Sequence, residues 1–249
     1  MKAMILAAGE GTRMRPLTAS LPKPMLPIAG RPALEYTIGW LRFHGIREIV
    51  INLHHCPEAV IHYFDDGSAF GVSIDYSVED HILGTAGGTK RRANLFDRSF
   101  AVVYGDVLTD LDLSRLVQYH STRTSRFHLT MSLYRVPDPE RCGVAVLDTR
   151  GRVTSFIEKP ERGGCPSDLA SAGVLVLDPE ILRYVPEDVF FDYGRDLFPA
   201  LLSGGVPIYG WLLPKDSYLV DFGTPEGYKR AQDEWPTRRA HDFLRASVQ

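Results

Sequence analysis

The sequence predicts an α/β fold with a doubly wound, mostly parallel, Rossmann-like sheet and a mixed, partly antiparallel second half. In the first 120 residues, short apolar runs rich in β-branched residues alternate with stretches of helical periodicity. Such alternation is typical of a parallel sheet that is covered by helices on both faces. After residue 120, strand-like runs follow one another without helices between them, which indicates antiparallel pairing.

The first half contains four expected strands and four expected helices. The strands cover residues 2–7, 48–53, 72–78 and 100–105, and the helices cover residues 33–45, 57–64, 87–96 and 112–120. The helix over 33–45 follows Pro32 and ends at Gly45, the usual asymmetry of helix ends. Asp112 is the expected N-cap of the helix over 112–120.

The second half is richer in strands. Its expected strands cover residues 127–136, 143–148, 152–160, 169–178, 207–214 and 217–223, and its expected helices cover residues 194–205 and 225–235. No Ser/Gly-rich linker separates the halves, so residues 1–235 are expected to form one domain, followed by a polar tail over residues 236–249. Because no hexapeptide repeat is present, we expect no β-helix domain.

Composition excludes several classes of protein. The chain has 249 residues, 44% of them hydrophobic and 24% charged, and a net charge of −3, which does not favour binding to nucleic acid or to an anionic membrane. No apolar run approaches the roughly 18–20 residues of a membrane span, and the N-terminus does not resemble a signal peptide. Three cysteines without Cys-x-x-Cys spacing predict reduced thiols in a cytoplasmic protein, with neither disulfides nor a zinc site. The eight histidines show no metal-ligand spacing either.

The loop after the first expected strand, AAGEGTRMRP over residues 7–16, has the chemistry of an anion site. Gly9 and Gly11 let a ligand approach the backbone, whose N–H groups can surround an anion. Arg13 and Arg15 add positive charge suited to phosphate. Lys23 stands between two prolines, which restrict the backbone that carries its ammonium group. Together these residues predict a polyphosphate site.

Two other phosphate-binding patterns do not fit. The string G-x-x-x-x-G-K-[ST] of a P-loop is missing, and Met14 stands where a dinucleotide-binding loop needs its third glycine. A glycine-rich turn with solvated arginines is the plain structural alternative.

The longer stretch LAAGEGTRMRPLTASLPKPMLPIAGRPALEY resembles the signature of the sugar-1-phosphate nucleotidyltransferases, G-x-G-T-R followed by P-K-P. The strings LGTAGG, YGDV, EKP, SAGVLVL and YLVDFGTPEGY follow in that family's order and cover roughly residues 2–231. The resemblance implies a GT-A-like nucleotidyltransferase fold, with a nucleotide-binding half over residues 1–120 and a sugar-phosphate-binding half over residues 121–235. Mannose-1-phosphate and heptose-1-phosphate guanylyltransferases are the most similar branch.

The resemblance also implies a reaction and its residues. A nucleoside triphosphate and a sugar 1-phosphate would give a nucleotide-sugar and pyrophosphate, with Arg13 and Lys23 as catalytic cations and Mg²⁺ held by Asp106 and Asp221. The implied nucleotide-binding residues are Leu6, Ala7, Ala8, Gly9, Gly11, Thr12, Arg13, Glu79, Gly84 and Thr85. The implied sugar-phosphate-binding residues are Gly143, Glu158, Lys159, Ser171 and Gly173. Ser171 replaces the family's common Asn, and Tyr104 replaces another, so local contacts at both positions stay open.

Glu79 indicates the base. Guanine presents an N1–H and an exocyclic amine side by side, a pair of donors that suits a carboxylate. We therefore expect GTP as the nucleotide, with thymidylyl-, uridylyl- or cytidylyl-transfer and a non-catalytic nucleotide-sugar-binding regulator as alternatives. The expected partners are the two small substrates, without nucleic acid or membrane. The oligomeric state stays open, with a homo-oligomer among the options.

Overall fold

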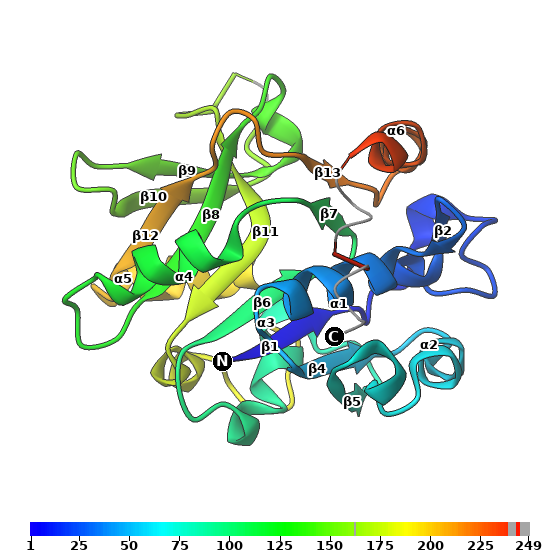
Figure 1. The fold of residues 1–249 in the computed structure, drawn as a ribbon. Coiled ribbons are helices and arrows are strands. Elements are labelled where there is room, and N and C mark those ends of the chain that lie inside the picture. Colours follow the sequence, from blue (N-terminus) through cyan, green and yellow to red (C-terminus); the bar gives the residue numbers. More distant parts are fainter. Residues whose placement is uncertain (162, 239–242, 245–249) are drawn as a thin grey trace. The chain divides into compact units, whose positions relative to one another are not determined.

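The computed structural model describes residues 1–161, 163–238 and 243–244 (Figure 1). The chain divides into two compact units that interleave in the sequence. Unit 1 consists of Met1–Ile82, Val103–Leu113 and Asp216–Gln249, and unit 2 consists of Leu83–Val102 and Ser114–Lys215. The boundary expected at residue 120 therefore lies inside unit 2. Most of the expected tail over 236–249 lies outside the described residues.

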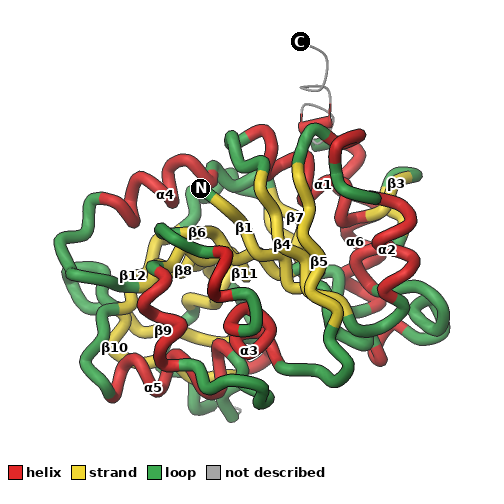
Figure 2. The backbone as a smooth tube through the Cα atoms, turned by 90° about the horizontal axis from the view of Figure 1, so that it is seen from below, coloured by secondary structure: helices red, strands yellow, loops and turns green. Residues whose placement is uncertain are grey.

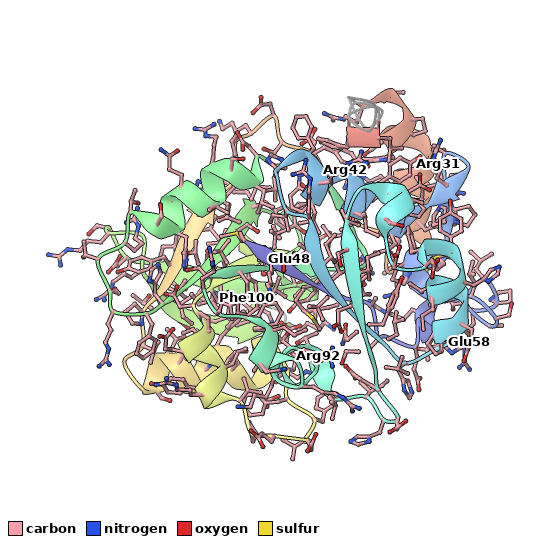
Figure 3. The ribbon with its side chains drawn as sticks, turned by 60° about the horizontal axis from the view of Figure 1, so that its bottom comes forward. Arg31, Arg42, Glu48, Glu58, Arg92 and Phe100 are labelled. Carbon is pink, nitrogen blue, oxygen red and sulfur yellow. The ribbon has the colours of Figure 1, made fainter. Side chains whose placement is uncertain are left out.

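Three parallel strands form the centre of unit 1. They are β1 (Lys2–Leu6), β4 (Glu48–Leu53) and β5 (Ser73–Val78), and β4 lies between the other two (Figure 1). Apolar side chains fill β1 and β4 almost completely, as expected for strands that are buried on both faces. All three strands end at the same edge, and the loops that follow them carry most of the predicted nucleotide-binding residues. At the opposite edge, Lys2 pairs with Glu48, and Figure 3 labels Glu48 there.

The helices of unit 1 are α1 (Ala33–Phe43), α2 (Pro57–Phe64) and α6 (Pro225–Glu234). A two-residue ribbon pairs β2 (Pro27–Ile28) with β3 (Arg31–Pro32) just before α1. A second ribbon pairs β7 (Val107–Thr109) with β13 (Leu219–Asp221) in antiparallel orientation. This second ribbon joins segments more than 100 residues apart in the sequence, and it carries both predicted metal ligands at one end.

Unit 2 is built on antiparallel pairing. Strands β9 (Gly143–Leu147), β10 (Val153–Glu158), β11 (Leu169–Leu177) and β8 (Leu129–Arg135) pair in the order β10-β9-β11-β8. One further strand, β12 (Ile208–Leu212), runs parallel to β8. Helices α4 (Leu113–Ser121) and α5 (Phe198–Ser203) lie on opposite faces of these strands (Figure 2). The predicted α/β class with a partly antiparallel second half is confirmed.

Two helices differ from the prediction at their ends. The helix expected over 87–96 is α3 (Gly84–Lys90), followed by a 3-10 turn over Ala93–Leu95. Its start shifts because the Phe191 carbonyl accepts two backbone N–H groups of its first turn. The helix expected over 194–205 opens as a π-helical turn over Tyr193–Leu197 before α5 begins.

Strand β6 (Phe100–Tyr104) is the segment along which the chain passes from unit 2 to unit 1. The three cysteines are present as thiols and not as disulfides. Within the described residues, none of the helices combines the length and the apolar character that crossing a bilayer requires.

Trp235, at the end of α6, is a main support of unit 1. It is 1% exposed and packs against Tyr36 and Tyr218, with ring centroids 5.6 Å and 5.5 Å away. Its indole N–H has no hydrogen-bond partner among the described residues, so its contribution is packing of the ring.

We expect Trp235→Ala to lower the free energy of unfolding by about 3–5 kcal/mol, because it removes a large buried ring and leaves a cavity. Trp235→Phe keeps an aromatic ring and loses no hydrogen bond, so its cost should be clearly smaller. Urea unfolding followed by circular dichroism measures both values. Equal losses for the two variants, or a negligible loss for the alanine variant, would contradict this account of the core.

Candidate functional site

The loop after β1 presents bare backbone at the carboxyl edge of the unit 1 sheet. The Ala7 N–H is the first after the strand and donates to the Asn52 side chain at 2.9 Å. At Gly9, a Cβ atom would meet no other atom within 4 Å, so the backbone there is open to a ligand. Gly11 has φ +65°, a conformation that favours glycine, and its carbonyl accepts the Thr18 hydroxyl. The two cations of this loop, Arg13 and Arg15, are exposed.

Lys23 points toward the first of the two predicted metal ligands. It begins a 3-10 turn after the buried Pro22, and its Nζ lies 2.8 Å from Asp106 Oδ2. The lysine side chain is 12% exposed and the aspartate side chain 25%. Gly105, just before Asp106, lies close to the end of β1, because a Cβ there would lie 2.7 Å from the Leu6 carbonyl oxygen. The predicted lysine and the predicted carboxylate thus form a half-buried ion pair.

The β7–β13 ribbon brings the second carboxylate to the same place. Asp221 is the last residue of β13 and stands opposite Val107, the residue after Asp106. The Phe222 N–H donates to the Asp106 carbonyl at 2.9 Å, which extends the ladder. A Cβ atom on Gly223 would lie 2.8 Å from Asp221 Oδ1, 2.9 Å from Asp106 Oδ2 and 3.1 Å from Lys23 Nζ. Two carboxylates and one ammonium group therefore surround a single point that only a glycine leaves free.

Two carboxyl groups lie close together in this cluster, and burial together with this proximity raises the pKa of one of them. Asp221 is exposed as a residue, yet protein atoms displace water around its carboxyl, and Asp106 adds like charge. These two causes raise the pKa of Asp221 to about 6, while the Gly223 N–H, Lys23 and Arg13 oppose the rise. A cation between the carboxylates would relieve their repulsion.

Glu79 is placed differently from a simple exposed loop residue. It is 2% exposed, and its Oε1 accepts a hydrogen bond from Asn52 Nδ2 at 2.8 Å. The same Asn52 side chain accepts the Ala7 N–H through its oxygen. One amide therefore links the phosphate-type loop to the carboxylate that was predicted to contact the base. The Glu79 carbonyl is engaged by His54 at 2.7 Å.

In unit 2, the predicted Gly84 and Thr85 lie against a segment that the sequence did not single out. Gly84 has φ +75°, and a Cβ there would lie 2.6 Å from the Phe191 carbonyl oxygen. The Thr85 hydroxyl donates to Asp192 at 2.7 Å and accepts the Tyr193 N–H at 2.9 Å. The polar string FDYGRD was the available signal for this segment. Its π-helical turn over Tyr193–Leu197 is a feature that is frequent at functional sites.

The carboxylate of Glu158, at the end of β10, lies close to the backbone at Gly143 and Gly194. A Cβ on Gly143 or on Gly194 would lie 2.5 Å or 2.6 Å from Glu158 Oε2, so both glycines are needed for the carboxylate to lie there. Burial and the nearby Asp192 raise the pKa of Glu158, while Lys159 and Arg195 lower it. The structure thus brings the predicted Gly143 and Glu158 together, and it adds Asp192, Gly194 and Arg195.

The remaining predicted residues of unit 2 lie on neighbouring backbone. Lys159 has φ +50°, and its N–H donates to the Cys142 carbonyl at 3.0 Å. Ser171 pairs with Leu133 in the β11–β8 ladder, and Gly173, with φ +72°, lies where the register of that ladder shifts. Both residues therefore belong to the backbone of β11.

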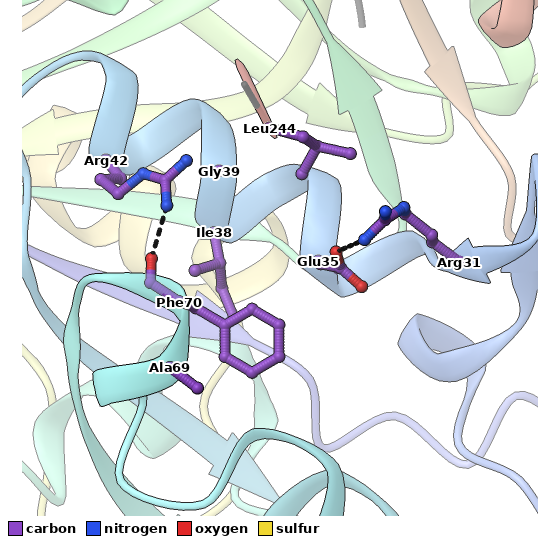
Figure 4. Close-up of a pocket in the computed structure, with 8 residues that line it drawn as sticks. All are labelled: Arg31, Glu35, Ile38, Gly39, Arg42, Ala69, Phe70 and Leu244. Atoms are coloured by element: carbon purple, nitrogen blue, oxygen red, sulfur yellow. Dashed lines mark hydrogen bonds and ion pairs between the residues drawn. The ribbon is translucent and has the colours of Figure 1, made fainter. Parts of the chain in front are cut away.

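A pocket of about 190 Å³ in unit 1 lies elsewhere, between α1 and the turn at Phe70 (Figure 4). Its two arginines already have partners. Arg42 donates to the carbonyl oxygens of Phe70 and Phe243, and Arg31 pairs with Glu35. None of the predicted site residues lines this pocket.

Comparison with known proteins identifies the class to which this fold and these two clusters belong. The chain belongs to the nucleotidyl transferase family, whose family model matches residues 2–237.

Two curated relatives cover most of this chain. A UTP–glucose-1-phosphate uridylyltransferase of Synechocystis is 40% identical over 245 residues, which is 93% of this chain. A mannose-1-phosphate guanylyltransferase of Mycobacterium tuberculosis is 39% identical over 92% of this chain. The chain spans 62% of the length of each of these relatives.

Solved structures agree on the fold. A Bacillus anthracis protein named as a glucose-1-phosphate thymidylyltransferase, crystallised with sucrose, superposes with a TM-score of 0.82 at 25% identity and covers 94% of both chains. HddC from Yersinia pseudotuberculosis has a TM-score of 0.79 at 26% identity and covers 94% of this chain and 99% of its own. Another structure of HddC contains GMP-PN.

The raised pKa of Asp221 predicts a pH dependence of stability. The folded protein holds this proton more tightly than the unfolded chain, so ionising Asp221 costs stability as pH rises from about 4 to about 6. Without divalent cations, Asp221→Asn should therefore be more stable than the parent above pH 6, by about 1 kcal/mol after allowance for solvent screening. The two proteins should converge near pH 4.

Chemical unfolding with a chelator present, repeated between pH 4 and pH 8, measures this difference. Asp233→Asn, on an exposed position of α6, makes the same substitution away from the cluster. If Asp221→Asn and Asp233→Asn show the same pH profile relative to the parent, Asp221 is not strained by its surroundings.

Proposed function

We propose that this chain is a sugar-1-phosphate nucleotidyltransferase, which makes a nucleotide-sugar and pyrophosphate from a nucleoside triphosphate and a sugar 1-phosphate. The observation that carries the proposal is the convergence of Lys23, Asp106 and Asp221 around Gly223, in the unit whose β1 loop exposes open backbone. The family membership and the names of the relatives support the same reaction.

The reaction needs charge compensation more than proton transfer. A sugar phosphate oxygen is already an anion, so it can attack the α-phosphate without a strong base. The difficulty is to hold two polyanions in line, which fixed cations and orientation achieve. In this proposal the exposed Arg13 neutralises the departing pyrophosphate, and Lys23 stabilises charge at the α-phosphate.

We assign the two carboxylates to Mg²⁺. The fit is chemical and steric, because hard carboxylate oxygens suit this ion and the space next to them is one that a side chain at position 223 would fill. When bound, Mg²⁺ supplies charge neutralisation at the phosphates. Asp106 and Asp221 hold their oxygens in place through the β7–β13 ladder, and Lys23 keeps the Asp106 carboxylate oriented at 2.8 Å.

The unit 2 cluster is the proposed sugar-phosphate side. Glu158, kept against two glycines, can accept hydrogen bonds from sugar hydroxyls, and Lys159 supplies a cation for the sugar phosphate. Asp192 and Arg195 extend this set, since both act on the Glu158 charge. Gly173 and Ser171 contribute to this proposed side through the shape of β11, Gly173 by its positive φ and Ser171 by its small side chain.

A substrate panel tests the reaction. The full chain is incubated with Mg²⁺ and each pairing of GTP, UTP, dTTP, CTP or ATP with glucose, mannose or heptose 1-phosphate, and pyrophosphate release is measured. Release with at least one pairing is the expected result. Nucleotide-sugar binding without any release would instead identify a non-catalytic regulator.

We propose guanine as the base, on account of Glu79. Its carboxylate is held by Asn52 beside the β1 loop, and a carboxylate is an acceptor that suits the paired N–H donors of guanine. The guanylyltransferase relative and the HddC structure with GMP-PN support this choice, whereas the uridylyltransferase relative supports uracil.

Lys23→Ala should reduce kcat by about 10²–10³ at saturating Mg²⁺, because it removes a preorganised cation whose interaction strengthens in the transition state. Binding of the finished nucleotide-sugar should weaken much less. Lys23→Arg should be impaired to an intermediate degree, since the planar guanidinium does not match the place of a compact ammonium. Steady-state rates and calorimetric product binding give both quantities. Lys229→Ala, exposed on α6, is the matched control, and a Lys23→Ala variant as active as this control would make the turn merely structural.

Glu79→Gln should lower the GTP-to-UTP ratio of kcat/KM by about 10–100-fold, the value of one hydrogen bond to a charged group. Glutamine keeps the acceptor for Asn52 but replaces one carboxylate oxygen by a donor, which no longer suits guanine. Initial rates with the two triphosphates measure the ratio. An unchanged ratio would remove Glu79 from base selection, and a parent enzyme that prefers UTP or dTTP would refute guanine.

A further inference from the structure

Two histidines and one aspartate of unit 2 form a buried cluster outside the proposed site. His120 lies in the last turn of α4, His128 immediately precedes β8, and Asp178 directly follows β11. The histidines are 3% and 4% exposed, and the aspartate side chain is 17% exposed. His120 Nε2 lies 3.3 Å from Asp178 Oδ1, and His128 Nδ1 lies 3.3 Å from Asp178 Oδ2. No two of the three donor atoms are more than 4.8 Å apart.

The hydrogen bonds of His128 determine which nitrogen of its ring carries the proton when the ring is neutral. Its Nε2 lies 3.1 Å from the His120 carbonyl oxygen, which only accepts, so Nε2 carries the proton. Nδ1 of a neutral ring is then a lone pair, and it faces a carboxylate oxygen. It is buried and makes no hydrogen bond within the described parts of the chain. Two acceptors at this distance need a positive charge between them.

The remaining contacts of both rings resemble those of histidines that bind a metal. A histidine that binds a metal usually donates its second ring N–H to a carbonyl or another oxygen, which orients the ring. His128 Nε2 has the His120 carbonyl, and His120 Nδ1 has the Thr130 hydroxyl at 2.9 Å. The Asp178 carboxylate is oriented by the Ser99 hydroxyl at 2.6 Å and by the His128 N–H at 2.8 Å.

We propose that His120, His128 and Asp178 bind a divalent transition-metal ion of the zinc type, which ties α4, β8 and the end of β11 together. Two imidazoles and one carboxylate are ligands that Zn²⁺ favours, with water as the fourth. Zinc-to-ligand bonds of about 2.0–2.2 Å at tetrahedral angles put two ligand atoms about 3.3–3.5 Å apart. Each ring nitrogen lies at such a distance from one oxygen of the carboxylate, His120 Nε2 from Oδ1 and His128 Nδ1 from Oδ2.

The separation of the two ring nitrogens needs an adjustment of at most about 1.5 Å, from the 4.8 Å limit to the spacing of a tetrahedral pair. The rings already stack, with centroids 4.1 Å apart. Arg123 is the nearby charge that opposes a cation, and its guanidinium is held over the Tyr119 ring, 3.9 Å from the centroid. The partly exposed Asp178 gives the ion a way in.

Zinc binding by the full chain tests the proposal. After treatment with a chelator and its removal, the protein is titrated with ZnCl₂ in excess Mg²⁺, and bound zinc and the melting temperature are measured. We expect one zinc per chain and, at about 100 times Kd, a rise in melting temperature of about 5–10 °C. Co²⁺ in place of Zn²⁺ should give the absorption of a tetrahedral nitrogen–oxygen site.

Variants locate the ion. Asp178→Asn keeps its hydrogen-bond acceptor for Ser99 but loses the charge, and His128→Gln loses the ring nitrogen, so both should abolish the zinc-induced shift. His62→Gln, on an exposed position of α2, and Asp106→Asn should retain it. Failure of the parent to bind zinc, or equal shifts in all four variants, would overturn the proposal and leave a protonated His128 as the positive charge.

Discussion

The antiparallel ladder between β7 and β13 is the constraint on which the cluster of Lys23, Asp106 and Asp221 depends. Asp106 and Asp221 are negative and distant in the sequence, so nothing local brings them together and their charges oppose it. Three ladder pairs and the bond from the Phe222 N–H to the Asp106 carbonyl hold them in place. A two-stranded ribbon has little stability by itself. Neighbouring packing must therefore support it. Tyr218 directly precedes β13, and its ring packs against Trp235.

Glycine determines how closely the charges can meet. At Gly223 any side chain would enter the space between both carboxylates and Lys23, and at Gly227 a Cβ would lie 2.1 Å from the Asp221 carbonyl oxygen. The backbone around Asp221 therefore folds back on itself without side chains in the way. Lys23 contributes the charge that makes the arrangement stable, because two ionised acids beside one ammonium leave a single negative charge to be compensated. The same residual charge makes the place attractive to a cation.

Sequence reasoning succeeded where chemistry follows the ends of strands. β-branched runs located β1, β4 and β5, and parallel pairing then implied that the loops after them share one edge. The resemblance to the nucleotidyltransferases, and not their strand-end positions alone, implied Asp106 and Asp221 as metal ligands. The structure places the two carboxylates together in unit 1, and their metal role is a proposal. The glycine loop and Lys23 were recognisable because bare backbone and a constrained cation have few other uses at that position.

The rest depends on tertiary contacts that leave little trace in the sequence. Asp192 gains its importance only because its segment meets α3 within unit 2. The Thr85 hydroxyl, 107 residues earlier in the chain, donates to Asp192, and the neighbouring Phe191 carbonyl accepts two backbone N–H groups of α3. His120 and His128 lack any usual ligand spacing, since the end of α4 and the start of β8 bring them together only after folding. Local periodicity also missed the π-helical turn, because Asp192 and its accepted N–H groups, not the apolar pattern, determine how that helix begins.

Asn52 shows how one buried amide can couple two predicted parts of a site. The β1–β4 register places it opposite Leu6, so its oxygen meets the Ala7 N–H while its nitrogen meets Glu79. Both functions of the amide are needed, because an aspartate here would face the Glu79 carboxylate with like charge. A leucine would remove the acceptor of the Ala7 N–H and the donor that Asn52 offers to Glu79. Under the proposed function, the position of the phosphate loop and the orientation of the base-selecting carboxylate therefore cannot vary independently. A change of base specificity in this fold would have to alter position 79 while preserving an acceptor for Asn52.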